Sequence, residues 1–306
     1  MPPISRRAFL KTASASAAGA ALWTSTTARS VLANPLGLPI GLQLYSVRDL
    51  LPKDYEGTLK QLAALGYQEV EAAGFFGHSA ADVKRAMAQA GLHCVSAHYP
   101  LAQLLPAVDE TIQYAKDLDL DYIICSSPIP RDHAQMQPGS PRAVRRAMTL
   151  DDWRWNAGQF NAIGARVNAA GLRFGYHNHT EEFQVLDGVM PYDELLRLTD
   201  PAKVTMEMDC GWVIVGGQNP VDYLLRYPTR ISMLHVKDFQ LSGAKINIAE
   251  PPPSTEMGRG SINYIPIFKA AKHADIKHAF VEQEQFDIPP MEALKIDAEY
   301  MRALSV

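Results

Sequence analysis

The sequence predicts an α/β protein folded as a single (β/α)8 barrel, and three observations lead to this expectation. Eight short apolar runs rich in β-branched or aromatic residues recur along the chain, amphipathic segments precede most of them, and the alternation fills about 250 residues. An open, doubly wound sheet is the alternative, but its first strand usually leads into a glycine-rich phosphate-binding turn. The first apolar run here leads into "SVRDLLPKDYEG", which contains no such turn.

The predicted strands are the eight apolar runs. In chain order they cover residues 38–47, 67–74, 92–99, 121–127, 172–179, 204–210, 231–238 and 278–285. Helices are expected over the amphipathic segments "YEGTLKQLAALG", "AADVKRAMAQAG" and "WNAGQFNAIGARVNAAG", before the second, third and fifth strands. Each segment ends in Gly, the residue that most often ends a helix.

Two connections are longer than a simple loop between a strand and a helix: Ser127 to Asp152, and Gln240 to Ser261. In a barrel both would follow the C-terminal end of a strand, where lids and substrate loops lie. No internal repeat or linker indicates a second domain. Residues 34–306 are therefore expected to form one barrel.

Residues 1–33 have the features of a twin-arginine signal peptide. "SRRAFLK" precedes a run of small, weakly apolar residues, and "VLA" ends at Ala33 with small residues at the usual cleavage positions. The uncharged segment from Thr12 to Ala28 is too short and too rich in Ala, Ser and Thr to act as a membrane anchor. We therefore expect export by the twin-arginine route to the periplasm or the medium.

The net charge and the cysteine content indicate which partners and which covalent links to expect. Residues 1–33 hold four basic and no acidic residues, so 25 basic residues face 33 acidic ones in the remainder, a net charge of −8. A surface of this sign argues against nucleic acid as a partner. Cys94, Cys125 and Cys210 lie in apolar or strand-like stretches without CxxC spacing, so buried thiols are expected rather than disulfides.

Acidic and imidazole groups gather at the predicted strand ends, which is where barrel enzymes build their active sites. Because side chains alternate along a strand, residues two apart share one face. Strand ends one and four supply only Tyr45 and two serines. The other strand ends supply Glu69, Glu71, His98, His177, His179, Glu207, Asp209, His235, Lys237, Asp238, Glu282 and Glu284.

These residues predict a metal site. Any one of them alone is more often a solvated or hydrogen-bonded group, but "MEMD" and "FVEQE" place carboxylates inside apolar runs on separate strands. A buried acid without a partner is costly, and a divalent cation removes that cost. Carboxylates and imidazoles are suitable ligands for Mn²⁺, Zn²⁺ or Mg²⁺.

The motifs "YHNH", "MDCGW", "LHVKD" and "FVEQE", in this order, resemble the sugar isomerase/epimerase superfamily with the xylose isomerase-like TIM barrel. This superfamily includes ketose 3-epimerases, inosose dehydratases and, more distantly, endonuclease IV. The resemblance runs from "GLQLYSVRD" to the eighth strand. It implies a divalent metal held by Asp209, His235 and Glu282.

The fourth ligand is where this sequence departs from the epimerases. Their glutamate at the end of strand five falls at or beside His177. Either His177 replaces that carboxylate, or Glu182 in "HNHTEEF" binds the metal while the histidines serve the substrate. We expect Glu182, because a third carboxylate preserves the charge of the site. His179 is then a candidate acid or base.

The resemblance also implies the reaction. In the epimerases two metal-bound glutamates remove and return a proton next to a carbonyl group. Glu282 is one candidate base, and the opposite one would be His177 or His179, whose usual pKa suits proton transfer near neutrality. Lys237 would hold a substrate oxygen or an enolate. Such an unequal pair suits an isomerase or epimerase, and also a dehydratase or a lyase acting on 3-keto-glycosides.

The expected partner is a small-molecule carbohydrate. Glu71 and His98 are candidates for binding sugar hydroxyls, and Trp212 and Tyr45 for stacking on a sugar ring, each with a structural role as the alternative. Because sugar phosphates are largely intracellular, export favours a free sugar, an inositol or an oxidised glycoside. Related barrels often dimerise, so a homodimer is expected from the resemblance.

Two other functions remain open. A non-catalytic carbohydrate-binding barrel would keep the fold and lose the metal. An endonuclease IV-like enzyme would need more metal ligands and a basic surface, which the net charge of −8 does not provide.

Overall fold

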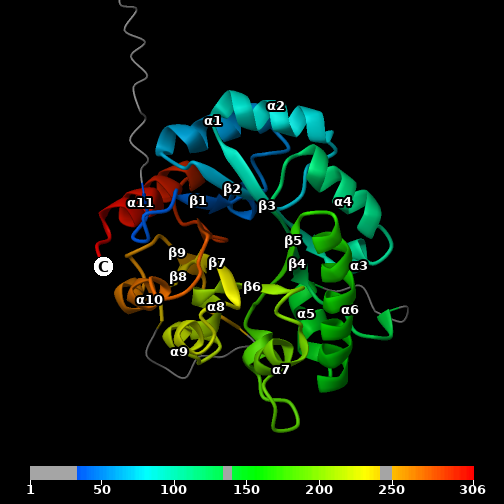
Figure 1. Cartoon of the computed structure of the whole chain (residues 1–306). Helices are drawn as coiled ribbons and strands as arrows, with labels where there is room; N and C mark the ends of the chain where they lie inside the picture. Colours follow the sequence, from blue (N-terminus) through cyan, green and yellow to red (C-terminus); the bar gives the residue numbers. More distant parts are fainter. Residues whose placement is uncertain (1–32, 134–139, 242–249) are drawn as a thin grey trace, which may run out of the picture. The chain divides into compact units, whose positions relative to one another are not determined.

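The structure is a computed structural model that describes residues 33–133, 140–241 and 250–306. Eight parallel strands close into a barrel in the order β1-β10-β7-β6-β5-β4-β3-β2, and β8 and β9 form a separate two-stranded sheet. Figure 1 looks into the ring of strands, with the helices arranged around it. The predicted (β/α)8 barrel is confirmed.

Every barrel strand overlaps one of the eight predicted runs. The first is shorter than predicted, because Leu44–Val47 form the 3-10 helix η1, where the Gln43 side chain accepts a hydrogen bond from the Tyr45 N–H. Tyr45 therefore lies beyond the strand end. The barrel strands are β1 (Gly41–Gln43), β2 (Glu69–Ala72), β3 (His93–Pro100), β4 (Tyr122–Ser127), β5 (Arg173–His177), β6 (Thr205–Asp209), β7 (Ile231–Val236) and β10 (His278–Val281).

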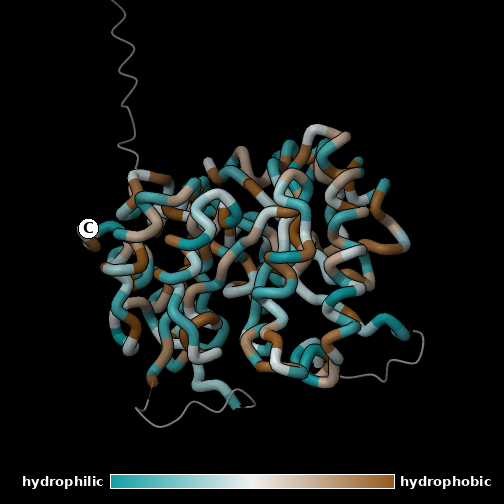
Figure 2. Tube along the Cα trace, turned by 60° about the horizontal axis from the view of Figure 1, so that its bottom comes forward, coloured by the Kyte–Doolittle hydropathy of each residue, from teal (hydrophilic) through white to brown (hydrophobic). Residues whose placement is uncertain are grey.

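One longer helix follows each barrel strand on the outside. Glycine ends α1 and α2 as predicted, since Gly66 and Gly91 adopt φ of 102° and 74°, which other residues rarely adopt. The outer helices are α1 (Tyr55–Leu65), α2 (Ala80–Ala90), α4 (Val108–Asp117), α6 (Leu150–Ala169), α7 (Pro191–Leu198), α9 (Pro220–Arg226), α10 (Tyr264–Ala271) and α11 (Pro290–Ala303). Figure 2 shows hydrophilic and hydrophobic residues alternating along these helices, as expected for helices with one face on a core.

Short helices lie in the loops at the strand ends. They are α3 (Leu101–Leu104), α5 (Pro141–Ala147), η3 (Glu181–Phe183) and α8 (Cys210–Val215). β8 (Asp238–Phe239), just before the second long connection, pairs antiparallel with β9 (Ser254–Thr255) inside it. Asp238 fixes the chain that follows, because its carboxylate accepts backbone N–H bonds from Gly258, Gly260 and Ile262.

Apolar side chains fill the barrel at the level where its strands begin. Val95, Tyr122, Ile124, Met233 and Phe280 form one cluster, and since β4 and β7 are not neighbours, these side chains meet across the barrel interior. Glycine on β1 and β5 makes room for them: a Cβ on Gly41 would lie 2.5 Å from Phe280. The interior is therefore filled by apolar side chains at this level.

Some predictions concern residues that lie outside the described ranges. The proposed signal peptide lies almost wholly outside them, as do the middle parts of both long connections, residues 134–139 and 242–249. Within the described residues, no helix is long and apolar enough to cross a membrane. The three cysteines are buried and free, as predicted.

Candidate functional site

Polar side chains replace apolar ones at the C-terminal end of the barrel. His235 follows Met233 by two residues, and Glu282 follows Phe280 by two, so the same inward face that is apolar at one level is polar at the next. The side chain of His98 is 12% exposed. The buried polar residues at this end include Gln43, Glu71, Ser96, His177, Glu207, Asp209, His235, Lys237 and Glu282.

Two overlapping groups of these residues have the composition and spacing of a metal site. The Asp209 set consists of His177, Asp209, His235 and Glu282, and the His98 set consists of His98, His177, Glu207 and His235. Within each set the potential ligand atoms all lie within 4.8 Å of one another. Both sets share His177 and His235, so they are two halves of one polar centre.

The Asp209 set joins the ends of β5, β6, β7 and β10. His235 Nδ1 lies 2.9 Å from Glu282 Oε2. One oxygen of Asp209 accepts a hydrogen bond from the Trp212 N–H at 2.8 Å, which caps the start of α8. The other oxygen is buried and accepts no hydrogen bond. It is ion-paired with the Lys237 ammonium group at 3.3 Å and can accept a further ligand.

The His98 set surrounds one carboxylate oxygen with three imidazoles. Glu207 Oε2 lies 2.7 Å from His98 Nε2, 3.1 Å from His177 Nδ1 and 3.4 Å from His235 Nε2. Glu71 lies in the same layer, 2.7 Å from His98 Nε2 and 2.8 Å from His235 Nε2. The layer of Glu71 and Glu207 therefore holds the histidines in place.

Lys237 is a fully buried cation beside the Asp209 set. Its Nζ lies 2.6 Å from Glu284 Oε1, 3.0 Å from Glu282 Oε2 and 3.3 Å from Asp209 Oδ2. The same atom lies 4.5 Å from the centroid of the Trp212 ring. Burial lowers the pKa of Lys237, but the three carboxylates outweigh it and raise the pKa far above neutrality. Lys237 is therefore permanently charged.

The four histidines at this end differ in protonation. Burial lowers the pKa of His98 and His235, but the adjacent carboxylates outweigh it, so the pKa of His98 is about 9 and that of His235 is also raised. Burial holds the pKa of His177 and His179 well below the usual range, and nearby positive charges lower it further. His177 and His179 are neutral at pH 7, so each offers a lone pair.

Comparison with known proteins assigns the barrel to a family. Residues 59–304 match the family described as "Xylose isomerase-like TIM barrel". The chain belongs to this family. Since the match covers most of the chain, it includes every strand of the site except β1.

Individual relatives agree with this assignment. A crystal structure described as a sugar phosphate isomerase/epimerase from Parabacteroides distasonis ATCC 8503 is 28% identical, with a TM-score of 0.69 over 86% of this chain and 97% of that one. The inosose dehydratase of Geobacillus kaustophilus is 23% identical over 266 residues, 80% of this chain and 86% of that protein. A zinc-bound IolI protein, 11% identical with a TM-score of 0.62 over 86% of this chain and 96% of that one, shares the fold.

Glu182, expected from the sequence as the fourth ligand in this member of the xylose isomerase-like family, has one oxygen engaged locally, and its other oxygen, Oε2, is buried without a hydrogen bond. Its Oε1 accepts hydrogen bonds from the Tyr176 hydroxyl at 2.5 Å and from the His179 N–H at 2.9 Å. Neither metal set contains Glu182, whereas both contain His177. The geometry therefore favours His177, the alternative that the sequence left open.

Asn178 lies directly after β5, between His177 and His179, in the segment called here the corner after β5. Its side chain accepts a hydrogen bond from the Asp209 N–H at 3.1 Å and lies 3.4 Å from the Asp209 carbonyl oxygen. The corner after β5 is thus tied to the end of β6. His179 comes next, with its ring centroid 4.9 Å from that of His177 and 6.4 Å from that of Trp212.

Of the four residues expected to bind substrate, Glu71 supports the histidines, and the other three differ in their exposure. Glu71 is fully buried and both of its oxygens are engaged, so its geometry is that of a support for the histidines. His98 is partly exposed and Trp212 is buried beside Lys237. Tyr45 is 41% exposed, and the Arg48 guanidinium lies 4.3 Å from its ring centroid.

Sequence reasoning missed part of the site and misplaced one residue. Glu207 was among the expected strand-end residues, but Gln43 and Ser96, which belong to the same buried layer, carried no sequence signal. The expectation that Glu69 lies with Glu71 at the active end is wrong. Glu69 begins β2 and contacts His278, the first residue of β10, at 2.8 Å, so it lies at the opposite end of the barrel.

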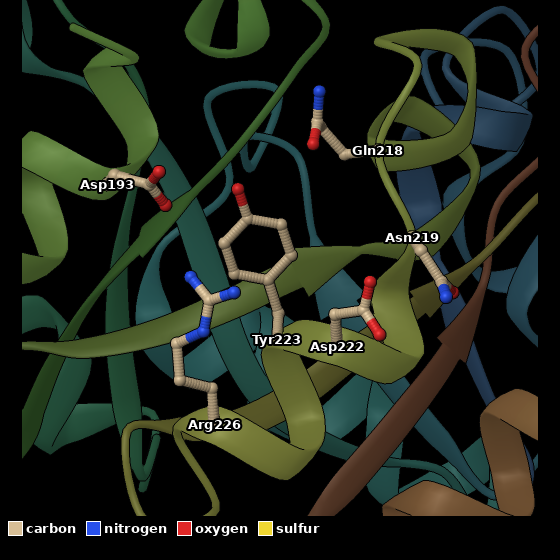
Figure 3. A pocket seen from close by; sticks show the side chains of 6 residues that line it. All are labelled: Asp193, Gln218, Asn219, Asp222, Tyr223 and Arg226. Carbon is tan, nitrogen blue, oxygen red and sulfur yellow. The ribbon is translucent and has the colours of Figure 1, made fainter.

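Two surface hollows lie elsewhere. One, of about 160 Å³, lies between α7 and α9 and is lined by Asp193, Gln218, Asn219, Asp222, Tyr223 and Arg226 (Figure 3). The other, of about 360 Å³, is lined by Tyr122, Arg173 and His278, the first residues of β4, β5 and β10, and by their neighbours. Neither hollow contains a residue of the two metal sets.

Proposed function

We propose that this protein is an exported, divalent-metal-dependent enzyme that removes a proton from the carbon next to a carbonyl group in a non-phosphorylated sugar, inositol derivative or keto-glycoside. The observation that carries the proposal is the Asp209 set, four buried ligand residues at the C-terminal end of the barrel. Relatives named as a sugar phosphate isomerase/epimerase and an inosose dehydratase support a sugar-like substrate.

The residues of the Asp209 set fit a divalent cation. Two carboxylates and two imidazoles suit Zn²⁺ or Mn²⁺, and Mg²⁺ less well. Asp209 Oδ2 is buried without a hydrogen bond and is ion-paired with the Lys237 ammonium group at 3.3 Å, so it can still accept a metal ion. We assign Asp209, His235, Glu282 and His177 as the ligands. When bound, the cation would polarise the substrate carbonyl and stabilise the negative charge that develops as the proton leaves.

His179 is the residue we assign to proton transfer. Its Nδ1 is buried and has no hydrogen-bond partner. The hydrogen bond from its backbone N–H to Glu182 holds it beside His177. Burial and nearby positive charges hold the pKa of His179 well below the usual range expected from the sequence, so the ring is neutral and Nδ1 is open to a proton from the substrate carbon, which then passes to another substrate atom. Glu282, the other candidate base, belongs to the Asp209 set and follows β10, whereas His179 follows β5.

Lys237 stabilises the charged form of the substrate. Its ammonium group faces the same centre and carries a permanent positive charge. Removal of a proton next to a carbonyl places negative charge on the carbonyl oxygen. A fixed, buried cation stabilises that charge more strongly than water does.

The two candidate bases, Glu282 and His179, are of different residue types, and this difference favours elimination over epimerisation. One base takes the proton, and the electron pair of the broken carbon–hydrogen bond forms a carbon–carbon double bond. The carbon–oxygen bond at the next carbon breaks, and the departing oxygen takes a proton from the other group, which acts as the acid. The net change is loss of water or an alcohol, with no oxidant. The inosose dehydratase relatives support this choice. Epimerisation begins with the same proton removal and is the second candidate.

The expected export of the protein bears on the kind of substrate it meets. The twin-arginine motif of residues 1–33 supports export, and sugar phosphates are largely intracellular. A substrate without a phosphate group is therefore the better match. A binding protein without turnover would need neither a metal nor a free imidazole nitrogen at this place.

The test is solvent exchange in heavy water. Purified, metal-loaded protein is incubated with free sugars, inososes and 3-keto-glycosides, and products are followed by mass spectrometry and NMR. We expect deuterium at the carbon next to the carbonyl together with loss of water or an alcohol. Asp209→Ala is the inactive control. Tight binding of a sugar without exchange in the wild type would identify a binding protein instead.

A further inference from the structure

The two ring nitrogens of His235 face different carboxylates. Nδ1 lies 2.9 Å from Glu282 Oε2, on the side of the Asp209 set. Nε2 lies 2.8 Å from Glu71 Oε1, on the side of the His98 set. The ring is fully buried, so water does not compete for either nitrogen.

Glu71 is held rigidly from its own side of the barrel. Its Oε1 accepts a hydrogen bond from Gln43 Nε2 at 2.7 Å, and its Oε2 accepts one from Ser96 Oγ at 2.6 Å. The donors come from β1 and β3, the two strands that flank β2. Because β2 and β7 are not neighbours, the contact from Glu71 to His235 crosses the barrel interior.

An ionised carboxylate accepts hydrogen bonds and donates none. Both ring nitrogens of His235 face a carboxylate, and a neutral ring has one proton to donate. Glu282 is a proposed metal ligand and Glu71 belongs to neither metal set, so the proton is assigned to Nε2, which leaves the lone pair on Nδ1. We propose that Glu71 is a positioning residue for the metal centre: it accepts the Nε2–H of His235 and so directs Nδ1 toward the metal. The inference rests on the proposed metal site. In other metal sites, loss of such a partner weakens metal binding by about 10–100-fold.

A second metal ion in the His98 set is the competing interpretation. It would need His177 and His235, which the first ion already uses. It would also need the lone pair of His235 Nε2, which lies at hydrogen-bond distance from a carboxylate. The proposal therefore predicts one ion per chain.

Glu69 provides a matched control for Glu71. Both are buried glutamates on β2, two residues apart on the inward face, and both contact a histidine. Glu69 contacts His278 at the opposite end of the barrel, away from both metal sets. Glu71→Gln and Glu69→Gln thus make the same chemical change on one strand.

The experiment measures zinc binding and ring protonation on the full chain. Zinc affinity is determined by competition with a chelator, and long-range ¹H–¹⁵N correlation spectra of the ¹⁵N-histidine-labelled, zinc-loaded protein report which ring nitrogen binds zinc. We expect one zinc per chain, with zinc on Nδ1 and a proton on Nε2 of His235. Glu71→Gln should weaken zinc binding by about 10–100-fold, and Glu69→Gln by less than about twofold.

Each contrary result has a distinct meaning. Unchanged zinc affinity in Glu71→Gln, zinc on Nε2, or two zinc ions per chain would overturn the inference and leave the proposed function standing. Failure of the wild type to bind zinc, manganese or magnesium would overturn both. If Glu71→Gln does not fold, Ser96→Ala removes one donor to Glu71, and we expect a smaller loss of affinity in the same direction.

Discussion

His177 and Glu182 lie five residues apart at one corner of the barrel but have different surroundings. His177 is near two other histidines and three carboxylates of the metal sets. Glu182 has one oxygen in hydrogen bonds with Tyr176 and the backbone of His179, and burial raises its pKa above the usual range. We therefore expect His177 to bind the metal and Glu182 to hold the shape of the corner.

Substitution at these two positions should separate the roles. His177→Ala removes a proposed ligand, so metal affinity should fall by more than about 100-fold, beyond the effect of losing a supporting residue. Glu182→Ala leaves the Tyr176 hydroxyl and the His179 N–H without their acceptor, and should lower the free energy of unfolding by about 1–3 kcal/mol. Metal titration and chemical denaturation check the two effects. The opposite pattern, with metal lost only in Glu182→Ala, would restore Glu182 as the ligand.

Lys237 should matter for catalysis more than for metal binding. Replacement by Met removes the cation that faces the Asp209 set but keeps much of the side-chain volume. We expect turnover to fall by about 10²–10³-fold, as when one stabilising donor is removed from an active site. Steady-state kinetics and metal content are measured on the same sample. Normal turnover in Lys237→Met would exclude this role.

At the scale of single residues, sequence patterns predicted the ligands better than their supports. Asp209, His235 and Glu282 lie in short motifs at strand ends, the family resemblance implied them as ligands, and the structure brings them together. The partners of Glu71, in contrast, lie on three other strands, β1, β3 and β7. Such contacts depend on the register between strands, which no local pattern contains.

At the scale of elements, α11 docks on the chain after β9 through a buried acid. Asp297 Oδ1 accepts a hydrogen bond from the Met257 N–H at 2.7 Å, while Oδ2 is buried without a partner. Burial raises the pKa of Asp297 to about 8, and the nearby carboxylates of Glu256 and Asp238 add to this, partly offset by Arg259. Asp297 is therefore protonated in the folded protein at moderately acid pH.

This contact should make stability depend on pH. The pKa of Asp297 is higher in the folded chain than the unperturbed value of 3.8, so its contribution is complete below about pH 4 and is lost as pH rises to about 8. The slope is at most about 1.4 kcal/mol per pH unit. Asp297→Asn should abolish this component, and unfolding curves of both proteins between pH 4 and pH 8 measure it. Parallel curves for the two proteins would refute the assignment.

The boundaries of helices could be predicted where a residue with a special backbone conformation or a capping side chain marks the end of the helix. Gly66 and Gly91 end their helices in the left-handed conformation, and Thr149 with Asp152 forms a capping box at the start of α6. The first strand was predicted too long, because its apolar run continues through η1. Apolar residues are needed in both elements, so hydrophobicity does not mark the boundary.

At the scale of the whole molecule, the barrel has a closed apolar end and a polar end. The apolar cluster fills the interior near the strand starts, while the two metal sets lie near the strand ends. The alternation of strands and helices predicted this architecture, since eight parallel strands with outer helices have few other arrangements. The placement of each polar residue along the barrel axis still required the structure, as Glu69 shows.

Residues 1–33 carry a separate prediction about the whole protein. If they direct export by the twin-arginine route, replacement of Arg6 and Arg7 by Lys should keep the protein in the cytoplasm, because that route depends on the arginine pair. Cell fractionation with immunodetection compares the two forms. Equal export of the double variant would show that another route or no route is used.

The central claim is that Asp209, His235 and Glu282 hold a catalytic divalent metal at the end of the barrel. The most direct test is elemental analysis of the purified wild type, Asp209→Ala and His235→Ala, with Glu69→Gln as a matched control at the other end. We predict one divalent ion per chain in the wild type and the control, and less than about a tenth of this in the two ligand variants, since loss of a ligand weakens binding by more than loss of a supporting residue. Full metal retention in both ligand variants would contradict the account.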